Sequence, residues 1–199
     1  FIARAMYWAY EYKVNEEDTF PAWAPMFHMA STDLAIGSLI IGASVAFVDG
    51  FEPKVLKRLI QKYKLSWLVL MPGMLEGFIK SLERKKIKIK GIKAMGAMAD
   101  LIPKKQIIEI TTLLNTPYLN SFGSTETGMP PASGGVISKK SKNFSLSKIQ
   151  SSFCEVILVN DNKVVELEIP GECAVRGPTL FSGYWKAEET NLKDFRNGW

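Results

Sequence analysis

The sequence predicts an α/β protein: a doubly wound, mostly parallel sheet flanked by helices, followed by part of a smaller antiparallel, β-barrel-like subdomain. Apolar runs of strand length alternate with amphipathic helical segments up to about residue 120, which is the pattern of β-α-β units. Residues 67–71 are apolar at every position, as a central parallel strand between two layers of helices requires. From Cys154 onward, short β-rich runs are joined by tight turns, which predicts antiparallel pairing.

The spacing of apolar residues and the positions of Gly and Pro predict where each element lies. In chain order we expect a helix over residues 1–12, a strand over 20–26, a helix over 31–41, a strand over 43–48, a helix from 53, a strand over 67–71, a helix over 74–82, a strand over 92–96 and a helix from 103. Ser31 is the expected N-cap of the second helix and Gly42 its end. Pro53 suits the first position of the third helix, whereas Pro21 and Pro25 limit the pairing of the first strand.

The composition of the sequence changes after Gly128. Met129-Pro130-Pro131 is expected to end regular structure, and residues 133–135 and 139–143, rich in Ser, Gly and Lys, indicate exposed loop. The later β-rich runs cover residues 155–159, 164–169 and 172–176. We therefore place a boundary near residue 145 and expect an α/β subdomain over residues 1–145 and an incomplete β-rich subdomain over residues 146–199.

Composition places the chain among soluble globular proteins. Its 199 residues are 47% hydrophobic and 23% charged, as is ordinary for such proteins. It starts at Phe1 without an initiator Met, and we interpret it as a segment of something larger. The longest nearly apolar run, residues 34–48, is shorter than the roughly 20 residues of a membrane span, so we expect no transmembrane segment. With no signal peptide visible, the predicted location is the cytoplasm.

The charged, cysteine and histidine residues limit the function classes further. The net charge is +5, but the basic run over residues 84–90 has no interleaved aromatic residues, so we expect no nucleic-acid partner. Binding to a polyanion through charge alone stays open as a weak alternative. Cys154 and Cys173 are expected to be reduced and buried. Because His28 is the only histidine, we expect neither a His/Cys zinc site nor a Ser-His-Asp triad.

Residues 120–128, Asn-Ser-Phe-Gly-Ser-Thr-Glu-Thr-Gly, follow a short apolar run and combine the groups that a nucleotide needs. In open α/β sheets, ligands bind at the carboxyl ends of the strands. Gly123 allows backbone to approach a ligand closely, and Phe122 offers a flat face for a base. Thr125 can hydrogen-bond a phosphate oxygen, and Glu126 is an oxygen ligand suited to a Mg²⁺ ion that keeps most of its waters. From these nine residues alone, a plain polar turn is an equally good interpretation.

Four blocks of sequence point to a family when they are considered together. They are Pro25-Met26-Phe27-His28, Gly96-Ala97-Met98-Ala99, Phe122-Gly123-Ser124-Thr125-Glu126 and Gly171–Pro178, the last continuing through Gly183-Tyr184-Trp185 to Trp199. In this order and at these separations they resemble the AMP-forming acyl-CoA synthetase and ligase superfamily, the adenylate-forming enzymes. The resemblance covers about residues 20–199 and is to an internal part of the family's large N-terminal domain.

The resemblance implies an ATP-dependent acid–CoA ligase, which activates a carboxylic acid as acyl-AMP and transfers it to coenzyme A. ATP, Mg²⁺, coenzyme A and the acid are the cofactors and partners that it implies; the oligomeric state is left open. By the same resemblance, Phe122 stacks on adenine, Thr125 contacts the α-phosphate, Glu126 holds Mg²⁺ and His28 lines the acyl entrance near the reacting carboxylate. The implied nucleotide-binding set also includes Gly96, Ala97, Asn120, Ser121 and Gly123.

The acid is expected to be fatty or otherwise hydrophobic. The methionines at positions 26, 29, 95 and 98 are expected to line an adaptable acyl pocket. In the fourth block, Arg176 is expected to be structural, and Glu172 and Tyr184 are expected to fix the β-rich strands.

Parts of the family pattern are missing or altered. The family's phosphate loop with its lysine, the ribose-binding aspartate and the C-terminal lysine lie outside these residues, so we expect the segment alone to be inactive. Ala30-Ser31, Met98 and the glycine-free stretch 143–150 depart from the family pattern. The alternatives are therefore a non-catalytic or diverged nucleotide-binding homologue, a carrier-protein adenylation domain and a luciferase-like oxidase.

Overall fold

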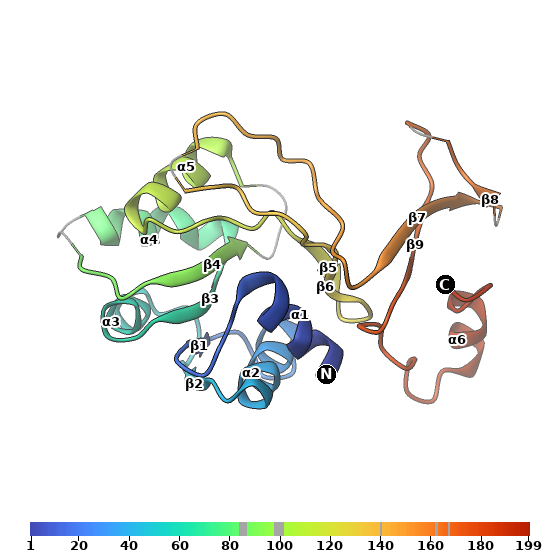
Figure 1. Cartoon of the computed structure of the whole chain (residues 1–199), viewed down its shortest axis with the longest axis horizontal. Coiled ribbons are helices and arrows are strands. Elements are labelled where there is room, and N and C mark those ends of the chain that lie inside the picture. Colours follow the sequence, from blue (N-terminus) through green and yellow to red (C-terminus); the bar gives the residue numbers. More distant parts are fainter. Residues whose placement is uncertain (84–86, 98–101, 140, 162, 167) are drawn as a thin grey trace.

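A four-stranded parallel sheet forms the centre of the N-terminal body in the computed structural model, which describes residues 1–83, 87–97, 102–139, 141–161, 163–166 and 168–199 (Figure 1). The strands lie in the order β2-β1-β3-β4, and every neighbouring pair is parallel. The elements of this body are α1 (Ile2–Tyr12), β1 (Thr19–Ala22), α2 (Met29–Ile41), β2 (Ser44–Phe47), α3 (Pro53–Lys62), β3 (Leu65–Leu70), α4 (Pro72–Glu83), β4 (Ile92–Ala97) and α5 (Lys104–Leu113). The predicted α/β class is confirmed.

The strand order makes the sheet doubly wound. Helix α2 carries the chain from β1 to the edge strand β2, whereas α3 and α4 carry it in the opposite direction, to β3 and then to β4. Because such crossovers are right-handed, α2 lies on one face of the sheet and α3 and α4 on the other. The connections that follow β1 and β3 leave in opposite directions, so a topological switch point lies between the carboxyl ends of these adjacent strands.

Pro21 explains why β1 pairs unequally with its two neighbours. The backbone N–H of Thr19 donates toward β3, to the carbonyl of Lys64, and alternate residues of a strand face the same side. The missing N–H of Pro21 therefore also faces β3, where only Thr19 keeps a registered partner. All four residues of β1 are paired with β2. The predicted limit on pairing is confirmed for this proline.

The core is built around β3 and the aromatic residues of α1. All six residues of β3 are buried, which matches the apolar run in the sequence. Trp67 of β3 packs against Trp8 and Tyr12 of α1, with ring centroids 5.3 Å and 6.4 Å apart. Aromatic pairs at these distances contribute roughly 0.5–1.5 kcal/mol beyond the area that they bury. Helix α1 is thereby fixed against the sheet.

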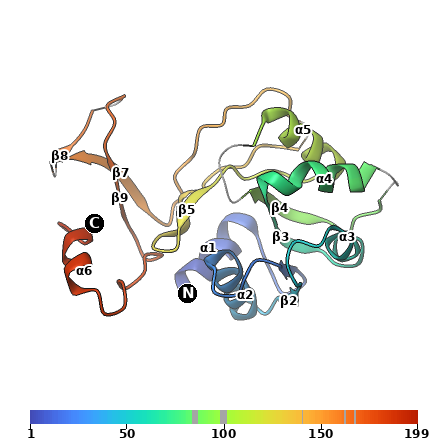
Figure 2. The ribbon, with the colours of Figure 1, turned by 180° about the vertical axis from the view of Figure 1, so that it is seen from behind.

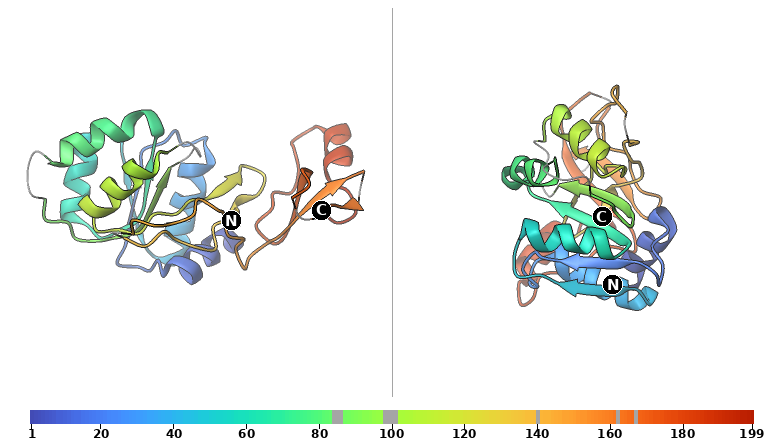
Figure 3. Two further views of the ribbon diagram at one scale, coloured as in Figure 1. Left: turned by 90° about the horizontal axis from the view of Figure 1, so that it is seen from above. Right: turned by 90° about the vertical axis from the view of Figure 1, so that its left-hand side faces the viewer.

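The C-terminal body contains a three-stranded antiparallel sheet in the order β8-β7-β9. It consists of β7 (Glu155–Asn160), β8 (Lys163–Val164), β9 (Glu172–Arg176) and the helix α6 (Glu188–Asp194). Figures 2 and 3 show this body beside the parallel-sheet body, with the hairpin of β5 (Phe122–Ser124) and β6 (Gly128–Ala132) between them. The antiparallel pairing is confirmed, although β8 is shorter than expected and α6 was not predicted. The boundary near residue 145 remains a prediction.

For the segment after Gly128, one expectation is wrong and another holds only in part. Regular structure does not end at Met129-Pro130-Pro131, because both prolines lie inside β6. Prolines are tolerated there since the sheet has two strands and its register shifts between Phe122 and Ser124, leaving positions without a ladder partner.

Residues 133–135 form a loop, as expected, and Gly134 is exposed, but Ser133 differs from the expected exposure. Ser133 is buried, and its carbonyl accepts a hydrogen bond from Tyr12. The Gly134 backbone N–H donates to the Ile149 carbonyl, and a Cβ at Gly134 would lie 2.2 Å from the Gln150 carbonyl oxygen. Close packing against residues 149–150, and not a need for mobility, accounts for these glycines.

Two further corrections concern single residues. Ser31 does not cap α2; the N-cap is His28, and Ser31 is fully buried with its hydroxyl donating to the Ala24 carbonyl. Cys154 is buried as expected, but Cys173 is exposed on β9, a strand without any fully buried residue. Both thiols are free. Among the helices of the described segments, none has the length and apolar character needed to cross a membrane.

Candidate active site

A cavity of about 430 Å³ opens at the carboxyl ends of β3 and β4. Val69 and Ala97 come from the ends of these strands, and residues 28–30 come from the start of α2, which follows β1. The cavity therefore lies at the switch point of the sheet, where ligands bind in open α/β folds. Its volume is within the range of sites for small molecules, roughly 300–1,000 Å³.

The motif over residues 120–128 forms one wall of this cavity. Phe122, Gly123 and Ser124 form β5, residues 125–127 form the turn, and Gly128 begins β6. The Thr127 hydroxyl accepts a hydrogen bond from the Ser124 backbone N–H over 3.0 Å and closes the turn. The apolar run before the motif is not a full strand, because only Tyr118 continues the sheet, through a parallel bridge to Met95.

Gly123 is required by the hairpin itself. A Cβ at this position would lie 2.0 Å from the carbonyl oxygen of Gly128 and 2.8 Å from Cα of Met129. The close approach that was predicted between Gly123 and a ligand is thus an approach between the two strands. Gly123 still lines the cavity, and its contact with a nucleotide stays a prediction.

Thr125 and Glu126 lie on the turn at the cavity rim. Hydrogen bonds from the Ser124 hydroxyl, the backbone N–H of Glu126 and the Tyr184 hydroxyl lower the pKa of Glu126. The carboxylate is therefore ionised at neutral pH and can act as a hard oxygen ligand. Among the described residues, no group of three or more His, Cys, Asp and Glu side chains converges on a metal position. Glu126 fits a Mg²⁺ ion that takes its other ligands from phosphate and water.

Arg4 of α1 lines the cavity and holds this turn, and it was not predicted as a site residue. Its Nη2 donates to the carbonyls of Thr125 and Glu126 over 3.0 Å and 3.3 Å, and its Nε donates to the Thr179 carbonyl over 2.8 Å. Its Nη1 forms an ion pair with Asp33 of α2, with both side chains about nine-tenths buried. The signal was present in the sequence: Arg4 is the only basic residue of this helical segment, whose other residues are apolar or aromatic apart from Glu11.

His28 lines the cavity and is also the N-cap of α2. Its Nδ1 accepts a hydrogen bond from the Ala30 backbone N–H over 3.0 Å. In the neutral ring the proton is therefore on Nε2, which leaves a donor for another partner. The predicted place of His28 at a ligand cavity agrees with this geometry, whereas its contact with the acid stays a prediction.

The remaining predicted residues divide between the cavity and its supports. Ala97, Ser121 and Phe122 line the cavity, and the Phe122 ring is half exposed. Gly96 is buried beside Trp67, where a Cβ would lie 2.7 Å from both the indole and the Leu119 carbonyl. It supports the wall without lining it. Met98 and Ala99 of the same block lie outside the described residues.

Asn120 is likewise a support. Its amide donates to the Leu146 carbonyl over 2.6 Å, and its Oδ1 accepts from Lys148 over 3.3 Å. Lys148 also donates to the Ser121 carbonyl over 3.1 Å and lines the cavity. Lys148 was not predicted as a site residue, because its segment is rich in serines and lysines and carries no motif.

Among the described residues, the expected methionine lining is found only in part. Met29 lines the cavity, but Met95 is fully buried in the core and Met26 is 45% exposed. Aromatic rings line the apolar side instead, from Tyr7 and Trp8 of α1 and Trp67 of β3. These rings were available in the sequence, but their convergence depends on how α1 packs on the sheet.

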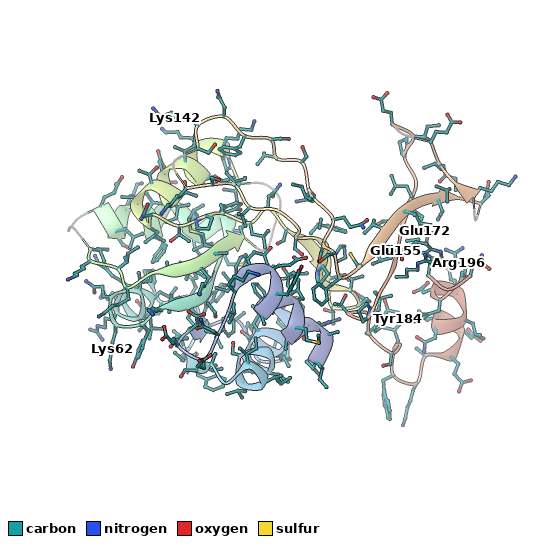
Figure 4. All side chains as sticks on the ribbon, in the orientation of Figure 1. Lys62, Lys142, Glu155, Glu172, Tyr184 and Arg196 are labelled. Atoms are coloured by element: carbon teal, nitrogen blue, oxygen red, sulfur yellow. The ribbon has the colours of Figure 1, made fainter. Side chains whose placement is uncertain are left out.

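The fourth block, residues 171–199, contains structural residues and one residue, Tyr184, that contacts the site. Arg176 is structural, as predicted: it pairs with Glu155 on the neighbouring strand over 2.6 Å. Glu172 pairs with Arg196 over 2.7 Å, and these four side chains gather in the C-terminal body (Figure 4; Arg176 is not labelled). Tyr184 does not fix the strands; its hydroxyl donates to Glu126 Oε1 over 2.8 Å.

A ligand cavity at a switch point is characteristic of α/β proteins that bind nucleotides and related small molecules, and the fold and the site define this chain as a member of that class. Within this class, the chain belongs to the AMP-binding enzyme family, whose model matches residues 1–185.

The relatives are longer proteins. The chain is 26% identical over 191 residues to the 2-succinylbenzoate–CoA ligase of Bacillus subtilis and 28% identical over 197 residues to 4-coumarate–CoA ligase 4 of Arabidopsis thaliana. These matches cover 94% and 92% of this chain but only 37% and 33% of the relatives.

The fold is also that of a solved relative. The structure of O-succinylbenzoate coenzyme A synthetase from Bacillus subtilis, in complex with ATP and magnesium ion, superposes with a TM-score of 0.80 at 23% identity. The match covers 100% of this chain and 42% of that protein.

Proposed function

We propose that this chain is the nucleotide- and acid-binding part of an ATP-dependent acid–CoA ligase. The observation that carries the proposal is the convergence of Phe122, Thr125, Glu126, Ala97 and His28 on one cavity at the switch point. These residues come from three distant blocks of the sequence, each of which resembles a block that contacts the nucleotide or the acid. The names of the relatives, which are ligases that join carboxylic acids to coenzyme A, support the same reaction.

The proposed reaction has two steps. An oxygen of the substrate carboxylate attacks the α-phosphorus of ATP, forming the mixed anhydride acyl-AMP and expelling pyrophosphate. The thiolate of coenzyme A then attacks the acyl carbon, forming the thioester and releasing AMP, while the thiol proton passes to solvent. Such transfers are accelerated mainly by positioning and by stabilising developing charge.

The residues of the chain supply that positioning. The exposed face of Phe122 is available to stack on adenine, and the Thr125 hydroxyl on the turn is available to an α-phosphate oxygen. Glu126 would hold Mg²⁺, which when bound neutralises charge on the phosphate oxygens. The backbone of this turn is fixed by Arg4, so these groups are held in place before the ligand arrives, at no cost in ordering at the moment of reaction.

The acid is proposed to be hydrophobic, and an aromatic acid fits better than a fatty acid. The lining includes the rings of Tyr7, Trp8 and Trp67, and offset or edge contacts between rings stabilise an aromatic ligand beyond the area that it buries. The names of the two curated relatives also specify aryl acids. A fatty acid remains the second candidate, since Met29 and Leu34 provide an aliphatic part of the same lining.

The test is product analysis on the intact protein. It is incubated with ATP, Mg²⁺, coenzyme A and acids from acetate through long-chain fatty acids to aryl acids, and AMP and acyl-CoA are measured by mass spectrometry. We expect thioester with a subset of hydrophobic acids, and a loss of about 100-fold in Glu126→Gln. The matched control is Glu76→Gln, on the exposed face of α4, which should keep full activity.

The other functional classes predict different products. Acyl-AMP without transfer to coenzyme A would indicate a carrier-protein adenylation domain. A folded protein that binds ATP and forms no product with any acid would indicate a non-catalytic nucleotide-binding homologue. Either result would overturn the proposed ligase.

A further inference from the structure

The turn that carries Glu126 is held by a segment far along the chain. The Tyr184 hydroxyl, 58 residues later, donates to Glu126 Oε1 over 2.8 Å. The backbone N–H of Phe181 donates to the Glu126 carbonyl over 2.7 Å, and the Thr179 hydroxyl donates to the Thr127 carbonyl over 3.0 Å. The segment over residues 179–184 therefore contacts both the backbone of the turn and its carboxylate.

This segment is itself fixed by α6. The side chain of Asn191 accepts from the Tyr184 backbone N–H over 2.7 Å and donates to the Tyr184 carbonyl over 2.9 Å. The Tyr184 ring packs edge-on against Phe181, with centroids 4.8 Å apart, and Phe181 stacks on Phe195 at 5.3 Å. Backbone and ring of Tyr184 are thus both restrained. In Figure 4 the labelled Tyr184 lies on the side of the C-terminal body that faces the hairpin.

The Ser124 hydroxyl and the backbone N–H of Glu126 also donate to the Glu126 carboxylate, and Tyr184 is the donor that comes from the C-terminal body. An ionised carboxylate has about four lone-pair positions, so these three hydrogen bonds leave room for another ligand. Groups that hydrogen-bond to a metal-binding carboxylate fix its rotation, and their removal weakens metal binding by roughly 10- to 100-fold.

We propose that Tyr184, held by Asn191, is a positioning residue that orients the Glu126 carboxylate for a divalent metal bound with the nucleotide. The proposal rests on the proposed function, in which Glu126 holds that metal. It makes the C-terminal body part of the metal site, because the restraint on the carboxylate comes from the segment after β9 and from α6. Tyr184 touches neither substrate nor reacting atoms in this role.

The test uses Mn²⁺ as a probe, since it prefers the same oxygen ligands as Mg²⁺. The affinity of the intact protein for ATP is measured twice, once with EDTA and once with Mn²⁺, and bound Mn²⁺ is followed by electron paramagnetic resonance. The variants are Tyr184→Phe, which keeps the ring contact with Phe181, and Asn191→Leu, which releases the segment. Tyr63→Phe is the matched control: it has the same 37% exposure as Tyr184, and its hydroxyl has no hydrogen bond with the described residues.

We expect Tyr184→Phe to bind metal-free ATP within twofold of the wild type and to lose about tenfold in affinity for Mn²⁺ with ATP. Asn191→Leu should change the affinity for metal-free ATP and the affinity for Mn²⁺ with ATP in the same directions as Tyr184→Phe does. Tyr63→Phe should change neither affinity. If Tyr184→Phe binds Mn²⁺ as the wild type does, or if its metal-free ATP affinity falls equally, Tyr184 has no positioning role. Glu126→Gln separates the two proposals: if it leaves Mn²⁺ affinity unchanged, the assigned role of Glu126 fails, and the role of Tyr184 with it.

Discussion

Replacing Arg4 by Met tests whether the buried ion pair between Arg4 and Asp33 holds the site together. Arg4 and Asp33 have side-chain exposures of 12% and 9%, so Arg4→Met leaves a buried carboxylate without its cation. Breaking a buried pair from one side costs about 3–5 kcal/mol of stability. The carbonyls of Thr125, Glu126 and Thr179 lose their donor in the same variant, which adds to the loss. We expect the free energy of unfolding to fall by at least about 3 kcal/mol.

The loss of stability in Arg4→Met should depend on pH, and its direction follows from the pKa of Asp33. Burial raises the pKa of Asp33 above its usual range, and Arg4 opposes that rise. Without Arg4 the pKa of Asp33 in the folded state rises further above its unfolded value, so the folded state binds a proton more tightly than the unfolded state. Arg4→Met should therefore regain stability as the pH falls from 8 toward 5 and lose it as the pH rises.

Denaturant titration followed by tryptophan fluorescence measures the free energy of unfolding at each pH, because Trp8 and Trp67 pack where α1 meets the sheet. Arg4→Met with Asp33→Leu should recover part of the loss, since no charge then remains buried. Arg58→Met is the control, because Arg58 is exposed and makes no ion pair with the described residues; its effect should stay within about 0.5 kcal/mol. A loss below about 1 kcal/mol in Arg4→Met, with no pH dependence, would refute the reasoning.

Three further predictions concern the β5–β6 hairpin, the Phe122 ring and the Cys154 thiol. Gly123→Ala places a Cβ 2.0 Å from the Gly128 carbonyl oxygen and should abolish ATP binding in a calorimetric titration. In contrast, Gly77→Ala on the exposed face of α4, where nothing lies within 4 Å, should stabilise the protein by roughly 0.5–1 kcal/mol. Phe122→Ala should weaken ATP binding by about 5- to 150-fold and Phe122→Tyr should not, because stacking needs the ring and not the hydroxyl. Burial raises the pKa of Cys154 from its ordinary 9.0 to about 11, so the unfolded chain loses that proton first and stability falls as pH rises between these values. The fall amounts to about 1.4 kcal/mol at pH 10 and should be absent in Cys154→Ser; equal pH profiles for the two proteins would contradict it.

The fold of the N-terminal body was predictable because its signals are local. The apolar run that became β3 needs no partner to be recognised, and Pro53 and Gly42 mark helix ends by their own backbone chemistry. The errors arose where tertiary packing overrode local preference. Pro130 and Pro131 lie in a strand because no ladder partner requires their missing N–H groups, and a sequence does not show which side of a strand is unpaired.

The site was predictable only in part, for a related reason. Phe122, Thr125 and Glu126 stand in one motif, so their proximity is given by the chain itself. Arg4 and Tyr184 reach the same turn from 122 residues before and 58 residues after Glu126, and no periodicity links such positions. Their contacts depend on how α1 and the segment after β9 pack against the hairpin.

The measurement that tests the ligase most directly is the exchange of labelled pyrophosphate into ATP by the intact protein, with Mg²⁺ and an acid but without coenzyme A. Because exchange requires a reversible adenylation step, it isolates the chemistry assigned to the cavity. We predict exchange that depends on a hydrophobic, preferably aromatic, acid and that disappears in Glu126→Gln. Exchange that is absent with every acid, in a protein shown to bind ATP, would contradict the account.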